Sequence, residues 1–205
     1  MGAPINYVLD NTQLKLYSSV YTPANPSSIS DTTLVVGGGK DENLELSTGA
    51  NITTLLRTVT VDSTDKPTDY QLFKAFIKNN TANSILRDIK VYVEKGTSGI
   101  GTFEIAIESK TSSEYTSLSQ SPDKLGTLNL TDGTVSTEGS LKTIGGKTWN
   151  AAEDFSHALP VIDELAKGDS IAIWIKTKVT YGEVAGTFQT QITPVIYVTY
   201  RYSIV

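Results

Sequence analysis

The sequence of 205 residues contains no cysteine, one histidine and one methionine. Without cysteine the chain can form neither a disulfide nor a Cys-ligated zinc site, and thiolate chemistry is excluded. A single histidine does not build a metal site without a second strong ligand class. The absence of cysteine also means that the redox compartment cannot be inferred from the sequence.

The chain also lacks an excess of basic residues and a long apolar run. It has 17 Lys and Arg against 22 Asp and Glu, which gives a net charge of −5, and the basic residues are scattered. This balance argues against nucleic acid or anionic lipid as a direct partner. No apolar run approaches the ~20 residues of a membrane span, and the start MGAPINYVLDNT lacks the pattern of a signal peptide. We therefore expect a protein that is made in the cytoplasm and has no membrane partner.

The sequence also contains few patterns that are typical of catalytic or metal-binding sites. The segment 149–157 brings His157 beside Glu153 and Asp154, but no Ser or Cys has the spacing of an activated nucleophile. The run 37–40, Gly-Gly-Gly-Lys, lacks the other parts of a phosphate-binding loop and is interpreted as a flexible turn. Three aspartates in the turn 62–69 could offer oxygen atoms to Ca²⁺, yet their spacing matches no calcium loop. The sequence thus predicts a protein that is not an enzyme, with no catalytic residue, cofactor or metal.

Residues that favour strands and turns are abundant. The chain has ten Tyr and 16 Gly, together with many Thr, Val and Ile. In the stretch 70–95, two alternating runs flank the turn cluster 79–84, and their inward positions are Phe73, Ala75, Ile77, Ile89, Val91 and Val93. The pattern predicts two antiparallel strands that share a buried face.

Further alternating runs follow at 103–108 and 171–176, and a closing strand is expected at 195–202, where apolar and aromatic residues occupy both faces. Several short strands with turn clusters between them predict an all-β fold, an antiparallel β-sandwich of immunoglobulin-like or jelly-roll-like character. The shared period of two predicts these core residues: Phe73, Ile89, Val91, Ile105 and Ile173.

The sequence also predicts an extended arm before the β-sandwich domain and a long insert within it. Residues 1–33 contain Pro4, Pro23 and Pro26, which interrupt regular structure, so we expect an extended N-terminal arm. The β-sandwich domain then spans 34–205. It contains a long Ser/Thr-rich insert at about 109–148, and loops of this length are usually functional surfaces or partly ordered.

The order of the central motifs resembles that of structural proteins of tailed bacteriophages and related virus particles. A strand is followed by Lys-Asn-Asn, Ile-Lys-Val-Tyr-Val, Phe-Glu-Ile-Ala-Ile, a long insert, Leu-x-x-Gly-Asp-Ser and Ile-x-Ile-Trp-Ile-Lys. The resemblance covers about residues 69–178, and a weaker similarity is found at residues 37–46. The resemblance implies a non-enzymatic component of the virion that is made in the host cytoplasm, without placing it on the head, neck or tail.

The partners expected for such a subunit are other virion proteins and copies of itself. Aromatic residues of the arm and of the closing strand, together with a tryptophan on the outer face of 171–176, are the predicted partner contacts: Tyr7, Tyr17, Tyr21, Trp174, Tyr197, Tyr200 and Tyr202. The alternative is a carbohydrate-binding module or adhesin that stacks aromatic rings on a host-surface glycan. Two or more aromatic residues on one exposed face would favour that alternative.

Overall fold

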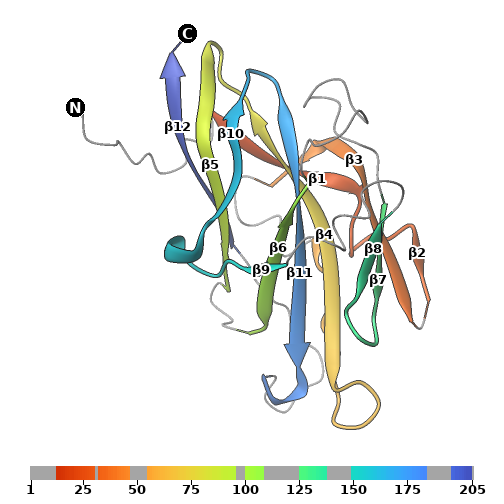
Figure 1. Cartoon of the computed structure of the whole chain (residues 1–205). Coiled ribbons are helices and arrows are strands. Elements are labelled where there is room, and N and C mark those ends of the chain that lie inside the picture. The colour runs from red at the N-terminus through yellow and green to blue at the C-terminus, as the bar shows by residue number, and fades with distance from the viewer. Residues whose placement is uncertain are drawn as a thin grey trace.

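The computed structural model describes residues 13–30, 32–46, 55–95, 100–108, 125–137, 149–183 and 195–204. These residues form an all-β fold in which antiparallel strands make one large, strongly curled sheet and one small sheet (Figure 1). Two single-turn 3-10 helices accompany them, η3 (Phe155–His157) and η4 (Tyr181–Glu183). Within these ranges, no helix has the length and apolar character needed to cross a membrane.

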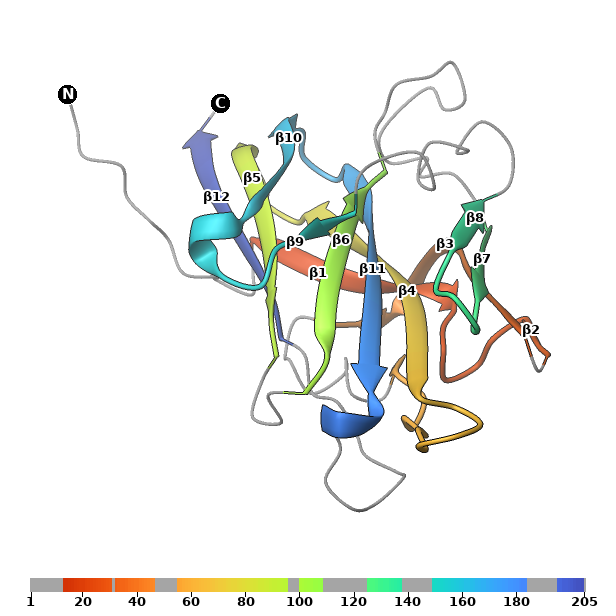
Figure 2. The same ribbon diagram turned by 60° about the horizontal axis from the view of Figure 1, so that its bottom comes forward.

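The large sheet has the order β8-β7-β3-β1-β4-β11-β6-β9, and β2 pairs with β3 beside this path. Its strands are β1 (Leu14–Tyr21), β2 (Ser28–Ile29), β3 (Thr33–Glu45), β4 (Thr68–Asn79), β6 (Thr102–Ile107), β7 (Leu125–Asn129), β8 (Val135–Thr137), β9 (Asn150–Ala151) and β11 (Ser170–Thr180). The small sheet has the order β10-β5-β12, with β5 (Ser84–Glu94), β10 (Leu159–Leu165) and β12 (Val195–Ile204). It lies across one face of the large sheet (Figure 2).

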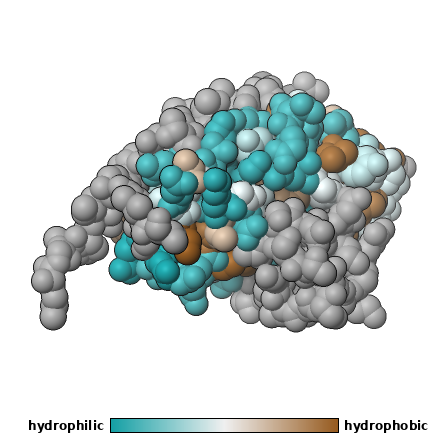
Figure 3. All heavy atoms as spheres, turned by 90° about the horizontal axis from the view of Figure 1, so that it is seen from above, coloured by the Kyte–Doolittle hydropathy of each residue, from teal (hydrophilic) through white to brown (hydrophobic). Residues whose placement is uncertain are grey.

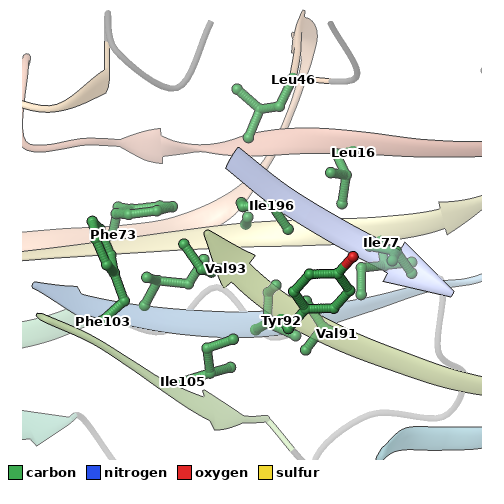
Figure 4. Close-up of a cluster of buried hydrophobic side chains, with 14 of the residues drawn as sticks. Leu16, Leu46, Phe73, Ile77, Val91, Tyr92, Val93, Phe103, Ile105 and Ile196 are labelled. Carbon is green, nitrogen blue, oxygen red and sulfur yellow. The ribbon is translucent and has the colours of Figure 1, made fainter. Parts of the chain in front are cut away.

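The main hydrophobic core fills the space between the two sheets. Side chains of β1, β4 and β6 meet side chains of β5 and β12 there (Figure 4). All five predicted core residues have no exposed surface, which confirms the predicted inward faces of their strands: Phe73, Ile89, Val91, Ile105 and Ile173. Burial on this scale is the dominant favourable term for a domain of this size.

The stretch 70–95 is arranged differently from a simple hairpin. Its two runs form β4 and β5, which do bury their apolar faces in the same core. However, β4 pairs with β1 and β11, whereas β5 pairs with β10 and β12. The turn at Asn79 therefore carries the chain from one sheet to the other. Asn79 Nδ2 donates 2.9 Å hydrogen bonds to the carbonyl oxygens of Ser84 and Leu165, which ties the two sheets together at this end.

A second, smaller core lies on the other face of the large sheet, where the sheet curls back on itself. Its buried members are Leu34, Val36, Leu72, Ala106, Leu128 and Trp174. β7 covers Trp174, and Gly126 makes this close approach possible, because a Cβ atom at that position would lie 2.7 Å from the indole Cζ3. As a result, β4 and β11 are buried on both faces along most of their length, as expected for strands covered on both sides.

The predicted boundary of the N-terminal arm at residue 33 is wrong for its second half. Leu14–Tyr21 forms β1, a strand inside the large sheet between β3 and β4, and Leu14 and Leu16 belong to the main core. The alternation of Leu14 and Leu16 is therefore a strand signal. Two of the three prolines that suggested an arm, Pro23 and Pro26, lie in the turn that follows β1. Residues 1–12 lie outside the described part of the chain.

The glycine run and the insert also differ from their predictions. Gly37 and Gly38 lie within the thirteen-residue strand β3 and have φ values of 114° and 82°, at a shift in its register with β1. They make an irregular strand rather than a turn. Within the insert, Leu125–Asn129 forms the strand β7, which pairs with β3. Residues 109–124 and 138–148 lie outside the described part of the chain.

Candidate partner-binding surface

The outer edge of β12 is the most prominent open backbone edge of the described structure. Among the described residues, β12 pairs with β5 alone, so its second edge carries no ladder. The strand is ten residues long, contains no proline, and has Arg201 as its only charged residue. The register shift between Thr199 and Arg201 comes from an extra residue in β5, where Asp88 has a φ of 52°. β12 itself therefore remains regular along its length.

The other edge strands of the described sheets are short, or they contain residues that hinder pairing with a further strand. β8, β9 and β2 have three, two and two residues. β10, the opposite edge of the small sheet, contains Pro160 and the exposed acids Asp163 and Glu164, and it has an irregularity between Pro160 and Ile162. Proline, charge, irregularity and short length are the devices by which native proteins prevent edge pairing. β12 has only one of them, its single charge.

An aromatic cluster lies beside this edge on the outer face of the small sheet. Val91 and Val93 of β5 point into the core, so Tyr92 between them points outward. Tyr92 stacks on Tyr197 of β12 with ring centroids 4.9 Å apart, and Phe155 of η3 meets Tyr92 edge-on at 6.2 Å. Phe155 is 60% exposed, whereas Tyr92 is almost fully covered and burial raises the pKa of its hydroxyl.

The predicted contact residues occupy very different positions. Trp174 is completely buried under β7, and Tyr17 and Tyr200 are also buried within the chain, so these three side chains do not present a surface to a partner. Tyr21 is 38% exposed at the end of β1, and Tyr197 is half-buried in the aromatic cluster. Tyr7 and the side chain of Tyr202 lie outside the described part of the structure. Sequence analysis missed Tyr92 and Phe155.

A buried ionic cluster lies next to the second core. Lys74 Nζ lies 3.1 Å from Glu108 Oε2, and both side chains are inaccessible to solvent. Trp174 Nε1 donates a 3.0 Å hydrogen bond to the same carboxylate oxygen, and the Lys74 amine lies 5.0 Å and 5.3 Å from the ring centroids of Phe76 and Trp174. The amine is therefore held by one carboxylate and two aromatic faces. The two opposite charges therefore compensate each other in the interior, and neither is accessible to solvent.

A second buried carboxylate, Asp69, anchors the start of β4. Arg57 binds it through both guanidinium Nη atoms, and Lys66 Nζ lies 3.2 Å away. The backbone N–H of Thr60 donates to its Oδ2 at 3.1 Å, and Arg57 also donates to the carbonyl of Tyr70 at 2.8 Å. Bidentate pairing fixes the geometry of this corner. Asp69 thus holds the 57–70 segment against β4.

The histidine region forms an exposed helix cap. Asp154 accepts hydrogen bonds from Ser156 Oγ at 2.6 Å and from the backbone N–H of His157 at 3.0 Å, and it lies 2.9 Å from His157 Nδ1. The Ser156 hydroxyl and then His157 lower the pKa of Asp154 to about 2. Ser156 and Asp154 both approach Nδ1, whereas a catalytic relay needs the nucleophile at the opposite ring nitrogen.

The aspartate turn proposed as a possible calcium site is organised by its own backbone. Asp62 Oδ1 accepts hydrogen bonds from the backbone N–H groups of Thr64, Asp65 and Lys66, and these bonds lower the pKa of Asp62. Such an Asx turn is the ordinary use of aspartate in a loop. Across the described ranges, no group of three or more His, Cys, Asp or Glu residues is arranged to hold a metal ion.

Comparison with known proteins gives no relative from which a function could be transferred. The chain matches no family model, no curated protein and no solved structure.

Proposed function

We propose that the chain is a non-enzymatic structural subunit of a virus particle, associated with its capsid, decoration or tail, and that it acts through protein–protein contacts. The observation that carries the proposal is the long regular edge of β12, which stands beside the aromatic cluster of Tyr92, Phe155 and Tyr197. An unprotected edge is a hazard for a protein that works alone, but it is a ready contact for a subunit among neighbours. The motif order of 69–178 supports the same interpretation by resemblance.

We further propose that the two-sheet arrangement is a β-sandwich of jelly-roll-like or immunoglobulin-like character. Its two sheets share one large core, and the turn at Asn79 crosses between them. The charged side chains of the interior, Lys74 with Glu108 and Asp69 with Arg57, are matched to one another and serve the scaffold. The described surface seen from above is mainly hydrophilic, with hydrophobic residues in small separate areas (Figure 3).

The test is whether the chain travels with particles. Particles from the source organism are purified by density gradient, and their proteins are identified by mass spectrometry. We expect the chain in the particle fraction, where it resists a salt wash and keeps a constant ratio to the major subunit across independent preparations. Recovery only in the soluble fraction would contradict the proposal.

Carbohydrate binding is the second candidate, and the aromatic cluster is the observation that favours it. Phe155 is largely exposed, but Tyr92 is nearly covered and Tyr197 is half-buried, so one ring and not several offers an open face. A host-surface glycan would stack on Phe155. Binding on a glycan array that Phe155→Ala abolishes, with His157→Ala as the neighbouring control, would favour this candidate.

A further inference from the structure

We propose that the edge of β12 receives residues 5–9 of a neighbouring copy as an added antiparallel or parallel strand, so that copies are linked by exchanged arms. This inference rests on the proposed function and names the contact by which the subunit would assemble. The β12 edge is ten residues long, contains no proline and carries one charged residue. Among the described residues, no strand pairs with its outer side. Backbone groups of such an edge gain hydrogen bonds when another strand joins it.

The sequence before Gln13 has the pattern of a strand. Ile5, Tyr7 and Leu9 alternate with other residues, and no proline follows Pro4 in the segment. A period of two places these three side chains on one face of an extended chain. Residues 1–12 could span about 40 Å when extended, which is long enough to reach a neighbouring molecule.

The position of Gln13 brings the base of this segment to β12. Tyr200 Oη donates a 3.2 Å hydrogen bond to Gln13 Oε1, and the backbone N–H of Asn80 donates to the Gln13 carbonyl at 2.8 Å. Gln13, the first described residue, therefore lies beside β12 of its own molecule. Two copies that approach along β12 could exchange arms reciprocally, and such exchange of an identical element is a low-cost route to association.

Charge and side-chain chemistry fit the same occupant. The one charged residue in 2–12 is Asp10, and the one charged residue of β12 is Arg201, which has the opposite sign. On the outer face of β12, Tyr197 continues the aromatic cluster, so an added strand with Tyr7 on that face would extend a row of aromatic side chains across strands. The blunted edge of β10 offers none of these features.

The absence of cysteine makes a direct test possible, since introduced thiols are the only ones present. Full-length Tyr7→Cys and Thr199→Cys proteins are purified separately, mixed at high concentration, oxidised and examined by non-reducing electrophoresis and mass spectrometry. Thr199 lies on β12 between the inward-facing Val198 and Tyr200, so its side chain faces outward. The matched control replaces Thr199→Cys by Asp163→Cys on the β10 edge.

We expect a mixed dimer from Tyr7→Cys with Thr199→Cys, formed at least tenfold faster than with Asp163→Cys. Equal rates, or no mixed dimer, would overturn the inference. A bond within one chain in the Tyr7→Cys/Thr199→Cys double variant, without mixed dimers, would show that the arm binds its own β12 and would also overturn it. If Thr199→Cys alone formed dimers faster than it formed mixed dimers with Tyr7→Cys, two β12 edges would pair directly. That result would also overturn the inference.

The particle experiment separates this failure from failure of the proposed function. If deletion of residues 2–12 leaves incorporation into particles unchanged, the proposal of exchanged arms is wrong, but the proposed structural role is not contradicted. If the full-length chain is absent from particles, the structural role itself fails, whatever the crosslinking shows.

Discussion

Lys74 and Glu108 form an ion pair with no exposed surface, 3.1 Å between Nζ and Oε2, and they connect β4 to the end of β6 across β11. Removing one member of such a pair leaves an uncompensated buried charge, which typically costs about 3–5 kcal/mol. We expect Lys74→Met to lower the free energy of unfolding by about this amount in urea titration. The Lys74→Met/Glu108→Gln double variant should recover most of the loss, because Gln is neutral and still accepts from Trp174 Nε1. Equal losses in the two variants would contradict this assignment.

The contact between Gly126 and Trp174 gives a second prediction. A methyl group at residue 126 would lie 2.7 Å from Trp174 Cζ3 and 3.3 Å from Leu72 Cδ2. We expect Gly126→Ala to destabilise the protein by about 1–3 kcal/mol through overpacking, with a red shift of tryptophan fluorescence if the indole gains solvent. Gly182→Ala is the matched control, since nothing lies within 4 Å of its added Cβ, and its effect should stay within about 0.5 kcal/mol.

Asn79 gives a third prediction at the crossing between the sheets. Its amide donates to two carbonyl oxygens, and its Oδ1 accepts from the backbone N–H of Thr81 at 2.9 Å and from the Thr81 hydroxyl at 2.7 Å. Asn79→Ala would leave buried partners unsatisfied, each at a cost of about 1–3 kcal/mol. Thermal melts should show a clear loss for Asn79→Ala and almost none for the exposed Asn83→Ala. Similar melting of both variants would show that the turn does not depend on this side chain.

The cap at Asp154 predicts a pH dependence. Its pKa is about 2 in the folded chain against a usual 3.8, first because of the Ser156 hydroxyl and then because of His157. A lowered pKa means that the ionised carboxylate stabilises the fold fully above about pH 4, and that this contribution is lost as the pH falls toward 2. Carboxyl chemical shifts followed by NMR should give this low value, and Ser156→Ala should raise it. A pKa near 3.8 in the wild-type chain would contradict the cap.

The sequence predicted the core of this fold better than its surface. Phe73, Ile105 and Ile173 were identifiable because alternation along a strand reports which face is buried, whatever the strand pairs with. Alternation does not report the partner, so the separation of β4 and β5 into two sheets depended on the Asn79 turn and was missed.

The boundaries and contact residues were harder because they depend on distant segments. Two prolines after Tyr21 obscured the fact that β1 is an interior strand, since its pairing with β4 depends on residues more than 50 positions away. Trp174 seemed able to serve as a surface platform until β7, from the insert, was found to cover it. Phe155 and Tyr92 meet only because the fold brings η3 against β5, which no local pattern reveals.

The most direct test of the account is amide hydrogen exchange along the two edges of the small sheet, measured in the isolated chain and in assembled particles. If the chain is a subunit linked through β12, amides of Val195–Ile204 should become markedly slower to exchange on assembly, while those of Leu159–Leu165 on the opposite edge change little. Unchanged exchange along β12 in the assembled state would contradict the account.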